Sequence, residues 1–208
     1  MRDMMNRVSL LFLMLIGTHL FGQNTKDGEE KTLIGSLSEV QWGGMIGAGV
    51  HLADMAGEAR VLQQFSGAVI INHNFRLGGS YAFLYNDILL DEINGIERQD
   101  LYMASVDLEY VWRPNAVVHL SFPLQVGMGE AEIENELDID WIDDDEEYDE
   151  DVFGFIHPSV QLELNLHRFV RLHLGAGYRF VYEASLPGLD NDALSGFNGT
   201  VGLRFGLF

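Results

Sequence analysis

The sequence predicts an all-β protein, an eight-stranded antiparallel transmembrane β-barrel, and three observations support this prediction. Apolar residues recur at every second position in eight separate segments, which is the period of a β-strand with one apolar face. The connections alternate between short turns and longer polar stretches, the pattern of short periplasmic turns and long extracellular loops. Charged residues within the eight segments all fall on the face opposite to the apolar one.

Composition limits the functions that the chain can have. Its 208 residues suffice for one domain, and 23 glycines with 47% apolar residues favour a β-rich domain. The 32 acidic and 12 basic side chains give a formal charge of −20, which argues against nucleic acid as a partner. The absence of cysteine excludes disulfides, thiolate metal sites and a lipid-modified N-terminal cysteine.

Residues 1–22 have the features of a secretory signal peptide. Arg2 and Arg7 flank a short basic region, residues 8–17 form an apolar core, and cleavage is expected after Gly22. The apolar run is too short for a helix that stays in a membrane. We therefore expect an exported protein, with a periplasmic segment at 23–36 and the barrel at 37–208.

The eight expected strands have about the length that a tilted strand needs to cross a membrane. They are the segments 40–50, 65–71, 77–85, 102–112, 118–126, 156–164, 170–182 and 197–207. Short turns are expected at 72–75, 113–116 and 165–168, and longer connections at 52–60, 86–100, 128–152 and 183–195. The even number of strands places both chain ends on the side of the short turns.

The composition of the second face decides between a membrane barrel and a soluble ligand-binding barrel. That face carries small residues and a few charges, which suits the narrow lumen of an eight-stranded barrel. We predict a lumen charge network with equal numbers of acids and arginines, as burial requires. Its members are Glu39, Arg76, Asp107, Glu109, Glu163, Arg171, Arg179 and Arg204. On the apolar face, Trp112 at the turn end and tyrosines toward the loop ends fit the aromatic girdles of a membrane protein.

Pro123 and Pro158 lie inside two of the expected strands. Each proline removes one hydrogen bond of the ladder, and a closed sheet has no free edge at which this loss is harmless. We expect a β-bulge below the longest loop to accommodate both residues.

Several segments of the chain resemble small outer-membrane β-barrel proteins of Gram-negative bacteria, of the OmpA/OmpX type. The segments are Trp42-Gly-Gly-Met-Ile-Gly-Ala-Gly49, Ile71-Asn-His-Asn-Phe75, Tyr110-Val-Trp-Arg-Pro-Asn115, Leu162-Glu-Leu-Asn-Leu-His-Arg-Phe169, Leu172-His-Leu-Gly-Ala-Gly-Tyr-Arg-Phe180 and Leu203-Arg-Phe-Gly-Leu-Phe208. The resemblance implies a barrel of eight antiparallel strands in the outer membrane. It also implies that the terminal Phe208 is part of the signal that the barrel-insertion machinery reads, although the apolar alternation of the last strand runs through Leu207 and Leu203.

The connection at 130–152 is strongly acidic, with 14 acidic and no basic residues among the 22 from Glu130 to Asp151. Mutual repulsion predicts a hydrated surface loop. Clustered carboxylates could also bind Ca²⁺ or Mg²⁺ weakly, although the spacing is not that of an EF-hand. The candidate ligands are Asp143, Asp144, Asp145, Glu146 and Glu147.

Histidines offer the one candidate for catalysis. His119, His157 and His173 share the second face with Ser121, Ser159 and Glu163, and a Ser-His-acid arrangement could perform acyl transfer on lipid. These residues are expected to point into the lumen, so a structural role is the simpler interpretation.

The sequence therefore predicts an integral outer-membrane barrel with a structural or surface-interaction role, no catalysis and no cofactor. Its expected partners are outer-membrane lipid and the insertion machinery, and the barrel is expected to be a monomer. The alternatives are a lipid-modifying hydrolase or acyltransferase and a periplasmic soluble ligand-binding barrel.

Overall fold

The computed structural model describes residues 40–208 apart from 56, 86–87, 93–94, 136–148 and 187–188. The expected signal peptide at 1–22 and periplasmic segment at 23–36 lie outside the described residues. Within the described part of the chain, no helix is long and apolar enough to cross a membrane.

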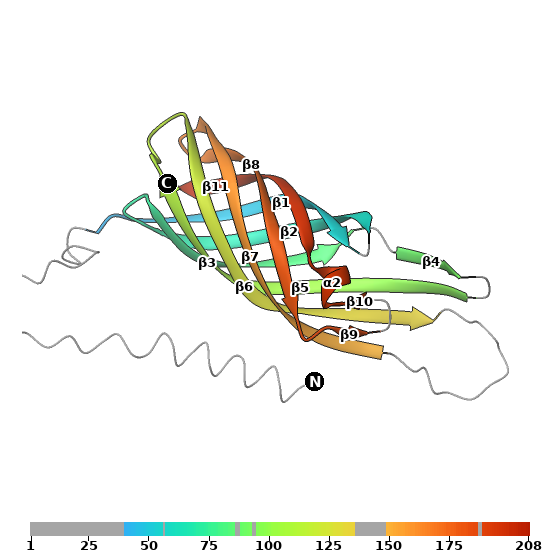
Figure 1. Cartoon of the computed structure of the whole chain (residues 1–208). Coiled ribbons are helices and arrows are strands. Elements are labelled where there is room, and N and C mark those ends of the chain that lie inside the picture. Colours follow the sequence, from blue (N-terminus) through green and yellow to red (C-terminus); the bar gives the residue numbers. More distant parts are fainter. Residues whose placement is uncertain (1–39, 56, 86–87, 93–94, 136–148, 187–188) are drawn as a thin grey trace, which may run out of the picture. The chain divides into compact units, whose positions relative to one another are not determined.

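Eight strands form a closed antiparallel barrel (Figure 1), which confirms the predicted fold. They are β1 (Trp42–Met55), β2 (Glu58–Ile71), β3 (Phe75–Leu84), β5 (Gly95–Trp112), β6 (Val118–Asn135), β7 (Asp149–His167), β8 (Val170–Tyr182) and β11 (Gly196–Leu207). Each strand pairs with the next of the eight, and β1 pairs with β11 from Gly44↔Leu207 to Ala53↔Asn198. Closure leaves the barrel without an unpaired strand edge.

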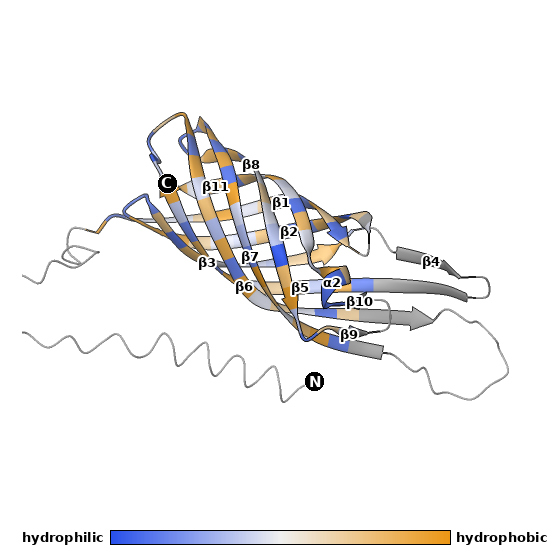
Figure 2. Cartoon of the chain, in the orientation of Figure 1, coloured by the Kyte–Doolittle hydropathy of each residue, from blue (hydrophilic) through white to orange (hydrophobic). Residues whose placement is uncertain are grey.

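The two faces of the barrel wall differ as the sequence predicted. Figure 2 shows apolar and polar blocks alternating along the strands. Large apolar side chains on the outer face are exposed, including Trp42 at 62% and Leu174 at 59%. Arg171 and Arg204 are buried in the lumen. The predicted orientation of the two faces is therefore confirmed.

A three-residue turn, residues 72–74, connects β2 to β3. Asn72 and His73 both have positive φ, 52° and 61°, and the Asn74 amide donates to the Ile71 carbonyl at 3.2 Å. Two consecutive residues with positive φ define a type I′ turn, whose twist matches that of the strands it joins. The Asn72 side-chain oxygen also accepts a hydrogen bond from the Gln41 amide at 3.0 Å, which ties the turn to the start of β1.

At the opposite end, the strands are longer than the alternation predicted. The ladder of β1 and β2 continues to Met55↔Glu58, so most of the longer connection expected at 52–60 is strand. β6 and β7 pair as far as Ile133↔Asp149, beyond the predicted ends of both strands. The alternation of apolar and polar residues does not predict these strand ends, because both of their faces contain apolar residues or acids.

Four short elements lie at this end, which we call the loop end. β4 (Ile88–Glu92) pairs with the extended part of β5, and β9 (Ser185–Leu186) pairs with β10 (Leu189–Asp190). The short helix α2 (Asn191–Leu194) follows β10, and the Asp190 carboxylate caps it by accepting from the Ala193 amide at 2.8 Å.

The two prolines interrupt the barrel ladder without a bulge. β6 and β7 pair at Ser121↔Gln161 and again at Leu124↔Pro158, with the same register on both sides of the gap. The expected β-bulge at this point was therefore wrong. The ladder lacks pairs between these two points, since each proline has no backbone donor, and the register of the two strands stays the same.

The loop half of the lumen contains a hydrophobic core. Its members are Ala53, Met55, Leu62, Ala82, Leu101, Met103, Ala131, Phe153, Phe155, Val181 and Leu194. Leu194 comes from α2, so the helix places an apolar side chain on the end of this core. Small and charged residues were predicted for the lumen, and this apolar layer was not.

Candidate functional site

Five of the predicted lumen charges meet in one cluster in the half of the barrel that holds the short turns. We call Arg76, Glu109, Glu163, Arg171 and Arg204 the ion cluster; the residues come from β3, β5, β7, β8 and β11. Each occupies a lumen-facing position of its strand, and the registers of neighbouring strands bring these positions to the same level. Arg76, for example, lies directly opposite Glu109 in the β3–β5 ladder.

Glu163 lies at the centre of the ion cluster and is 0% exposed. Its carboxylate accepts two hydrogen bonds from Arg76, at 2.6 Å from Nη1 and 2.8 Å from Nη2. Arg204 also contacts Glu163, and Arg171 Nη1 lies 3.4 Å from it. The two-pronged contact with Arg76 is the strong geometry for an arginine–carboxylate pair.

Glu109 links two of the same arginines. Arg76 Nη1 and Arg204 Nη1 each lie 2.9 Å from Glu109 Oε1. Two carboxylates and three guanidinium groups thus share one buried network, with no side chain in it left as an isolated charge. Burial of an ion is tolerated only with such partners, because desolvation alone costs several kcal/mol per ion.

Two further side chains complete this end of the lumen. His119 Nε2 lies 2.8 Å from Glu163 Oε2. The ring of Phe208 lies over the ion cluster, with its centroid 3.9 Å from the Arg171 guanidinium and 5.8 Å from that of Arg76. Phe208 therefore packs on cations at the lumen side, where the alternation of β11 places the residue that follows Leu207.

The other predicted network residues do not join the ion cluster. Asp107 accepts hydrogen bonds from Ser105 Oγ at 2.6 Å and from Ser80 Oγ and Gln125 Nε2 at 3.2 Å each. Arg179 donates to the Leu194 carbonyl instead of a carboxylate. Glu39 lies outside the described residues. The equal pairing of four acids with four arginines is thus not what the described residues form.

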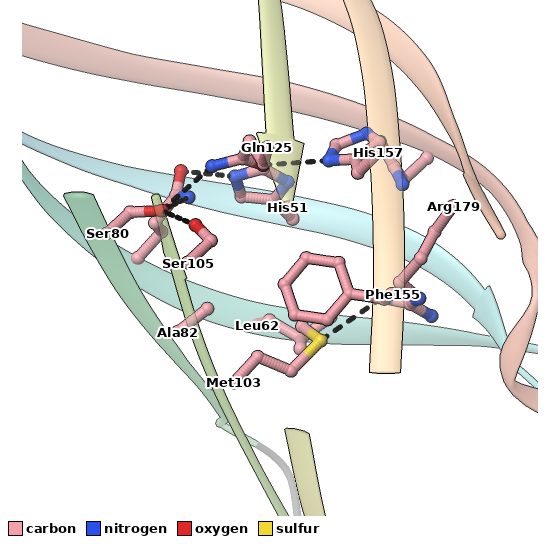
Figure 3. A pocket seen from close by; sticks show the side chains of 12 residues that line it. His51, Leu62, Ser80, Ala82, Met103, Ser105, Gln125, Phe155, His157 and Arg179 are labelled. Atoms are coloured by element: carbon pink, nitrogen blue, oxygen red, sulfur yellow. Dashed lines mark hydrogen bonds between the residues drawn. The ribbon is translucent and has the colours of Figure 1, made fainter. Parts of the chain in front are cut away.

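A polar belt occupies the middle of the lumen, between the ion cluster and the hydrophobic core. His51 Nε2 lies 2.6 Å from Gln64 Oε1, Gln64 donates to Ser80 Oγ at 3.0 Å, and Gln125 donates to the same hydroxyl at 2.8 Å. His157 Nδ1 lies 2.8 Å from Gln125 Oε1, as Figure 3 shows. This chain of hydrogen bonds connects β1, β2, β3, β6 and β7 across the lumen.

The lumen has little free space. One cavity of about 20 Å³ lies where the polar belt meets the hydrophobic core (Figure 3), and a second of about 30 Å³ lies between the belt and the ion cluster. A cavity needs about 10–15 Å³ to hold one water molecule. Each of these cavities therefore has room for one or two such molecules.

Of the candidate catalytic residues, His119 Nε2 and Ser121 Oγ lie 2.8 and 3.5 Å from the Glu163 carboxylate, whereas His157 and Ser159 have other partners. His157 is bonded to Gln125, Ser159 Oγ lies 3.5 Å from the Pro123 carbonyl, and Glu163 belongs to the ion cluster. Among the described residues, no serine hydroxyl forms a hydrogen bond with a histidine ring. The arrangement needed for an activated serine nucleophile is thus missing from the described part of the lumen.

The candidate metal ligands Asp143, Asp144, Asp145, Glu146 and Glu147 lie outside the described residues. Of the same acidic connection, Asp151 is described, and its Oδ2 accepts hydrogen bonds from the Ser185 amide at 2.5 Å and from the Ser185 hydroxyl at 3.2 Å. Asp151 of β7 thus holds the start of β9, which lies in the connection between β8 and β11.

A closed barrel of eight strands, with an apolar outer face and a filled ionic lumen, has the fold of the small outer-membrane β-barrels. Three solved structures are similar. Neisserial surface protein A matches with a TM-score of 0.53 and 13% identity, covering 81% of this chain and 99% of that one. The N-terminal β-barrel domain of Pseudomonas aeruginosa OprF matches with a TM-score of 0.51, 13% identity and the same two coverages.

The third structure is the attachment invasion locus protein Ail of Yersinia pestis, in complex with the heparin analogue sucrose octasulfate. It matches with a TM-score of 0.50 and 15% identity, covering 79% of this chain and 97% of that one. Comparisons with protein families and with curated proteins find no match. At these identities, the likeness shows the fold alone.

Proposed function

We propose that the protein is an integral outer-membrane β-barrel with a structural or surface-interaction role and no catalytic activity. One observation carries the proposal: large apolar side chains cover the outside of the barrel, while Glu163 and its arginines are buried inside. A protein dissolved in water has the opposite arrangement, because apolar burial drives its folding. The similar barrels support the outer membrane as the location.

The distribution of charge on the outer face fits a lipid belt. Among the side chains that the structure describes, the acidic ones at outward positions of the barrel strands are Asp54, Asp100 and Glu130, and all three lie toward the loop end. No arginine or lysine whose side chain the structure describes occupies an outward position of the eight barrel strands. A charge at the centre of the membrane would cost about 2–4 kcal/mol for a basic side chain on the lipid face of a barrel.

The soluble ligand-binding alternative fits less well. It would leave the outer face, including Phe197 at 75% exposure, in water, and monomeric soluble proteins rarely expose large contiguous apolar patches. It would also need a lumen that can hold a ligand, whereas the cavities measure about 20 and 30 Å³. Ligand pockets for small molecules are usually about 300–1,000 Å³.

We propose that the short turns face the periplasm and that the acidic connection faces the exterior. The acidic residues at 130–152 would then surround the loop end with negative charge. Such a surface repels sulfated sugars and other polyanions, so the ligand in the Ail structure is a poor guide to the partner of this chain. A cationic or a neutral partner fits better.

Migration in gels tests the proposed location. Detergent extracts of the envelope are compared with and without boiling, with the soluble fraction as control. A folded membrane barrel keeps its structure in unboiled detergent, so its mobility should change on boiling and it should be found in the envelope. Identical mobility together with recovery in the soluble fraction would favour the periplasmic barrel.

The interaction with the insertion machinery concerns Phe208. In the folded barrel, its ring lies on Arg171, so we propose that the machinery reads the residue before the lumen closes. Phe208→Ala should reduce the amount of barrel in the outer membrane of cells several-fold. No machinery is present when the purified variant refolds into detergent. The yield of folded barrel should therefore fall less there than the amount of barrel in cells. Equal losses in both measurements would assign Phe208 a packing role only.

We propose weak binding of Ca²⁺ or Mg²⁺ by Asp143, Asp144, Asp145, Glu146 and Glu147. Five neighbouring carboxylates attract divalent cations, and dissociation constants of loose surface sites are about 10⁻⁴–10⁻³ M. Calorimetric titration with Ca²⁺ should show heat that the variant with all five acids changed to amides lacks. Identical heats in the titrations of the two proteins would refute the proposed cation site.

The alternative function is that of an enzyme that acts on lipid. It would depend on His157, Ser159 and Glu163, whose hydrogen bonds lead to three different partners in the lumen. Phospholipid or lipopolysaccharide incubated with the purified barrel should stay intact. Hydrolysis that falls with each of Ser159→Ala and His157→Ala would overturn the proposal of a non-catalytic barrel.

A further inference from the structure

Arg179 is a buried cation whose charge no carboxylate balances within the described residues. It is 4% exposed and lies on the lumen side of β8. Its Nε and Nη2 donate to the Leu194 carbonyl at 2.9 and 2.8 Å, and its Nη1 lies 3.8 Å from Met103 Sδ. Both partners are neutral. The hydrogen bonds hold the guanidinium in place, but they leave a full positive charge away from water, which is costly.

The three arginines of the ion cluster are buried beside carboxylates that balance their charges. Arg76, Arg171 and Arg204 all contact Glu163, and two of them also contact Glu109. Arg179 lies on the same face of β8 as Arg171, eight residues nearer the loop end. The acids of the ion cluster therefore do not neutralise it by contact, and Arg179 needs a counter-charge of its own.

The cavity of about 20 Å³ adjoins Arg179 (Figure 3). None of its lining residues is acidic. The polar ones include the Asn198 amide as a potential donor, whereas the hydroxyls of Ser80 and Ser105 already donate to Asp107. His157 is buried and donates from Nδ1 to Gln125 Oε1, so its Nε2, which has no hydrogen-bond partner, is an acceptor in the neutral ring. A lining with one cation, a neutral amide and no carboxylate of its own attracts an anion.

The second cavity provides the contrast. Its lining includes Asp107 and Glu109 as well as Arg76 and Arg204, so its own side chains balance its charges. Water is the suitable occupant there. The first cavity differs because the positive charge of Arg179 in its lining has no acidic side chain beside it in that lining. Its volume admits a monatomic ion and excludes phosphate or sulfate.

We propose that the cavity beside Arg179 binds one small monatomic anion of the chloride class. The anion balances the Arg179 charge and accepts hydrogen bonds from the Arg179 guanidinium and the Asn198 amide. Because Arg179 also holds the Leu194 carbonyl, the ion stabilises the attachment of α2 to the barrel. The site is independent of the proposed surface role, since it depends only on the lumen.

The test uses the full barrel chain refolded in detergent, in sodium chloride or sodium gluconate of equal ionic strength. A ligand that binds only the folded state shifts the folding equilibrium by about tenfold at ten times its dissociation constant. We therefore expect chloride to raise the midpoint of thermal unfolding in a saturable manner, and bromide to do the same. Equal midpoints in chloride and gluconate would overturn the proposal.

Two variants locate the effect. Arg179→Met keeps much of the side-chain volume without charge and should unfold at the same midpoint in both salts. Asn198→Asp, which provides a carboxylate in the wall of the same cavity, should also lose the chloride dependence while it keeps the barrel folded. A dependence that persists in Asn198→Asp would place the anion elsewhere.

Crystals grown in bromide give the direct observation. Anomalous scattering should show one bromide in the cavity beside Arg179 of the wild-type barrel. A cavity that holds water only, with the anomalous signal absent or confined to the surface, would contradict the proposal whatever the salt dependence of unfolding.

Discussion

Glu163 shows at the scale of a single residue how a charge is accommodated inside this barrel. Its side chain is fully buried, yet its two oxygens receive Arg76 in a two-pronged contact and also meet Arg204, Arg171 and His119. The charge is tolerated because every direction of approach to the carboxylate is filled by a donor. Removing one charge from such a network leaves its partners buried and unbalanced.

Glu163→Gln tests this arrangement. The amide keeps the shape of the side chain but takes from Arg171 the carboxylate that it contacts and leaves Arg76 and Arg204 with Glu109 alone, so we expect a loss of about 3–5 kcal/mol in the free energy of unfolding. Urea unfolding of the barrel refolded in detergent or lipid measures it. Asp107→Asn is the matched control, because neutral donors bind Asp107 and no arginine depends on it. Equal losses in the two variants would contradict the central role of Glu163.

The sequence predicted the lumen location of most of these residues but only part of their pairing. Arg76, Glu109 and Glu163 alternate with apolar neighbours, so their face follows from the period of the strand. Alternation cannot show which levels of the barrel coincide, because the level depends on the strand registers. The partner of Arg179 is a main-chain carbonyl of α2, and a carbonyl leaves no mark in the sequence.

At the scale of the elements, glycines let neighbouring strands and lumen side chains come close together. A Cβ atom added at Gly127 in β6 would lie 2.0 Å from the Ala104 carbonyl oxygen and 2.8 Å from the Ser105 Cα of β5. Both are main-chain atoms of the paired strand, so a side-chain rotation cannot relieve the clash. Gly154 in β7 differs, since the nearest atom to its Cβ would be 4.0 Å away.

Gly127→Ala and Gly154→Ala therefore form a matched pair. We expect Gly127→Ala to lower the free energy of unfolding by about 1–3 kcal/mol, because the strands must move apart. Gly154→Ala should be neutral or stabilise by about 0.5–1 kcal/mol, because alanine loses less conformational freedom on folding. Urea unfolding of both variants in the same detergent checks the pair. An unchanged free energy of unfolding in Gly127→Ala would show that the close approach of β5 and β6 at Gly127 does not require glycine.

The ends of the elements were less predictable than their centres. Near the loop end, Phe153-Gly154-Phe155-Ile156 is apolar on both faces, so the period of two no longer distinguishes lumen from exterior. The structure buries Phe153 and Phe155 and exposes Ile156. The inward residues form the hydrophobic core at this end, which follows from the packing of α2 and of strands distant in sequence rather than from any local pattern.

At the scale of the whole molecule, three layers fill the lumen from end to end. The ion cluster, the polar belt and the hydrophobic core follow one another from the turn end to the loop end, and the cavities between them measure about 20 and 30 Å³. Eight strands enclose only enough room for such side chains. A continuous water-filled path therefore does not fit within the described lumen.

Planar bilayers test this consequence. The purified barrel should produce no step-like ionic currents at moderate voltages, because ions would have to cross a closed network of paired charges. Glu163→Gln, which disturbs the ion cluster and leaves the other two layers intact, should also remain silent. Regular conductance steps of the wild-type barrel would contradict the filled lumen.

The central claim is that the apolar face of the barrel contacts lipid, and the absence of cysteine from the chain allows a direct test with single spin labels. Labels are attached to Leu174→Cys and Val201→Cys on the outer face, and to Asp192→Cys on exposed α2 as reference. In lipid vesicles, paramagnetic resonance compares collisions with oxygen, which dissolves in lipid, and with a water-soluble nickel complex. The account predicts that the labels at 174 and 201 collide mainly with oxygen and the label at 192 mainly with nickel. Nickel collisions at 174 and 201 equal to those at 192 would contradict it.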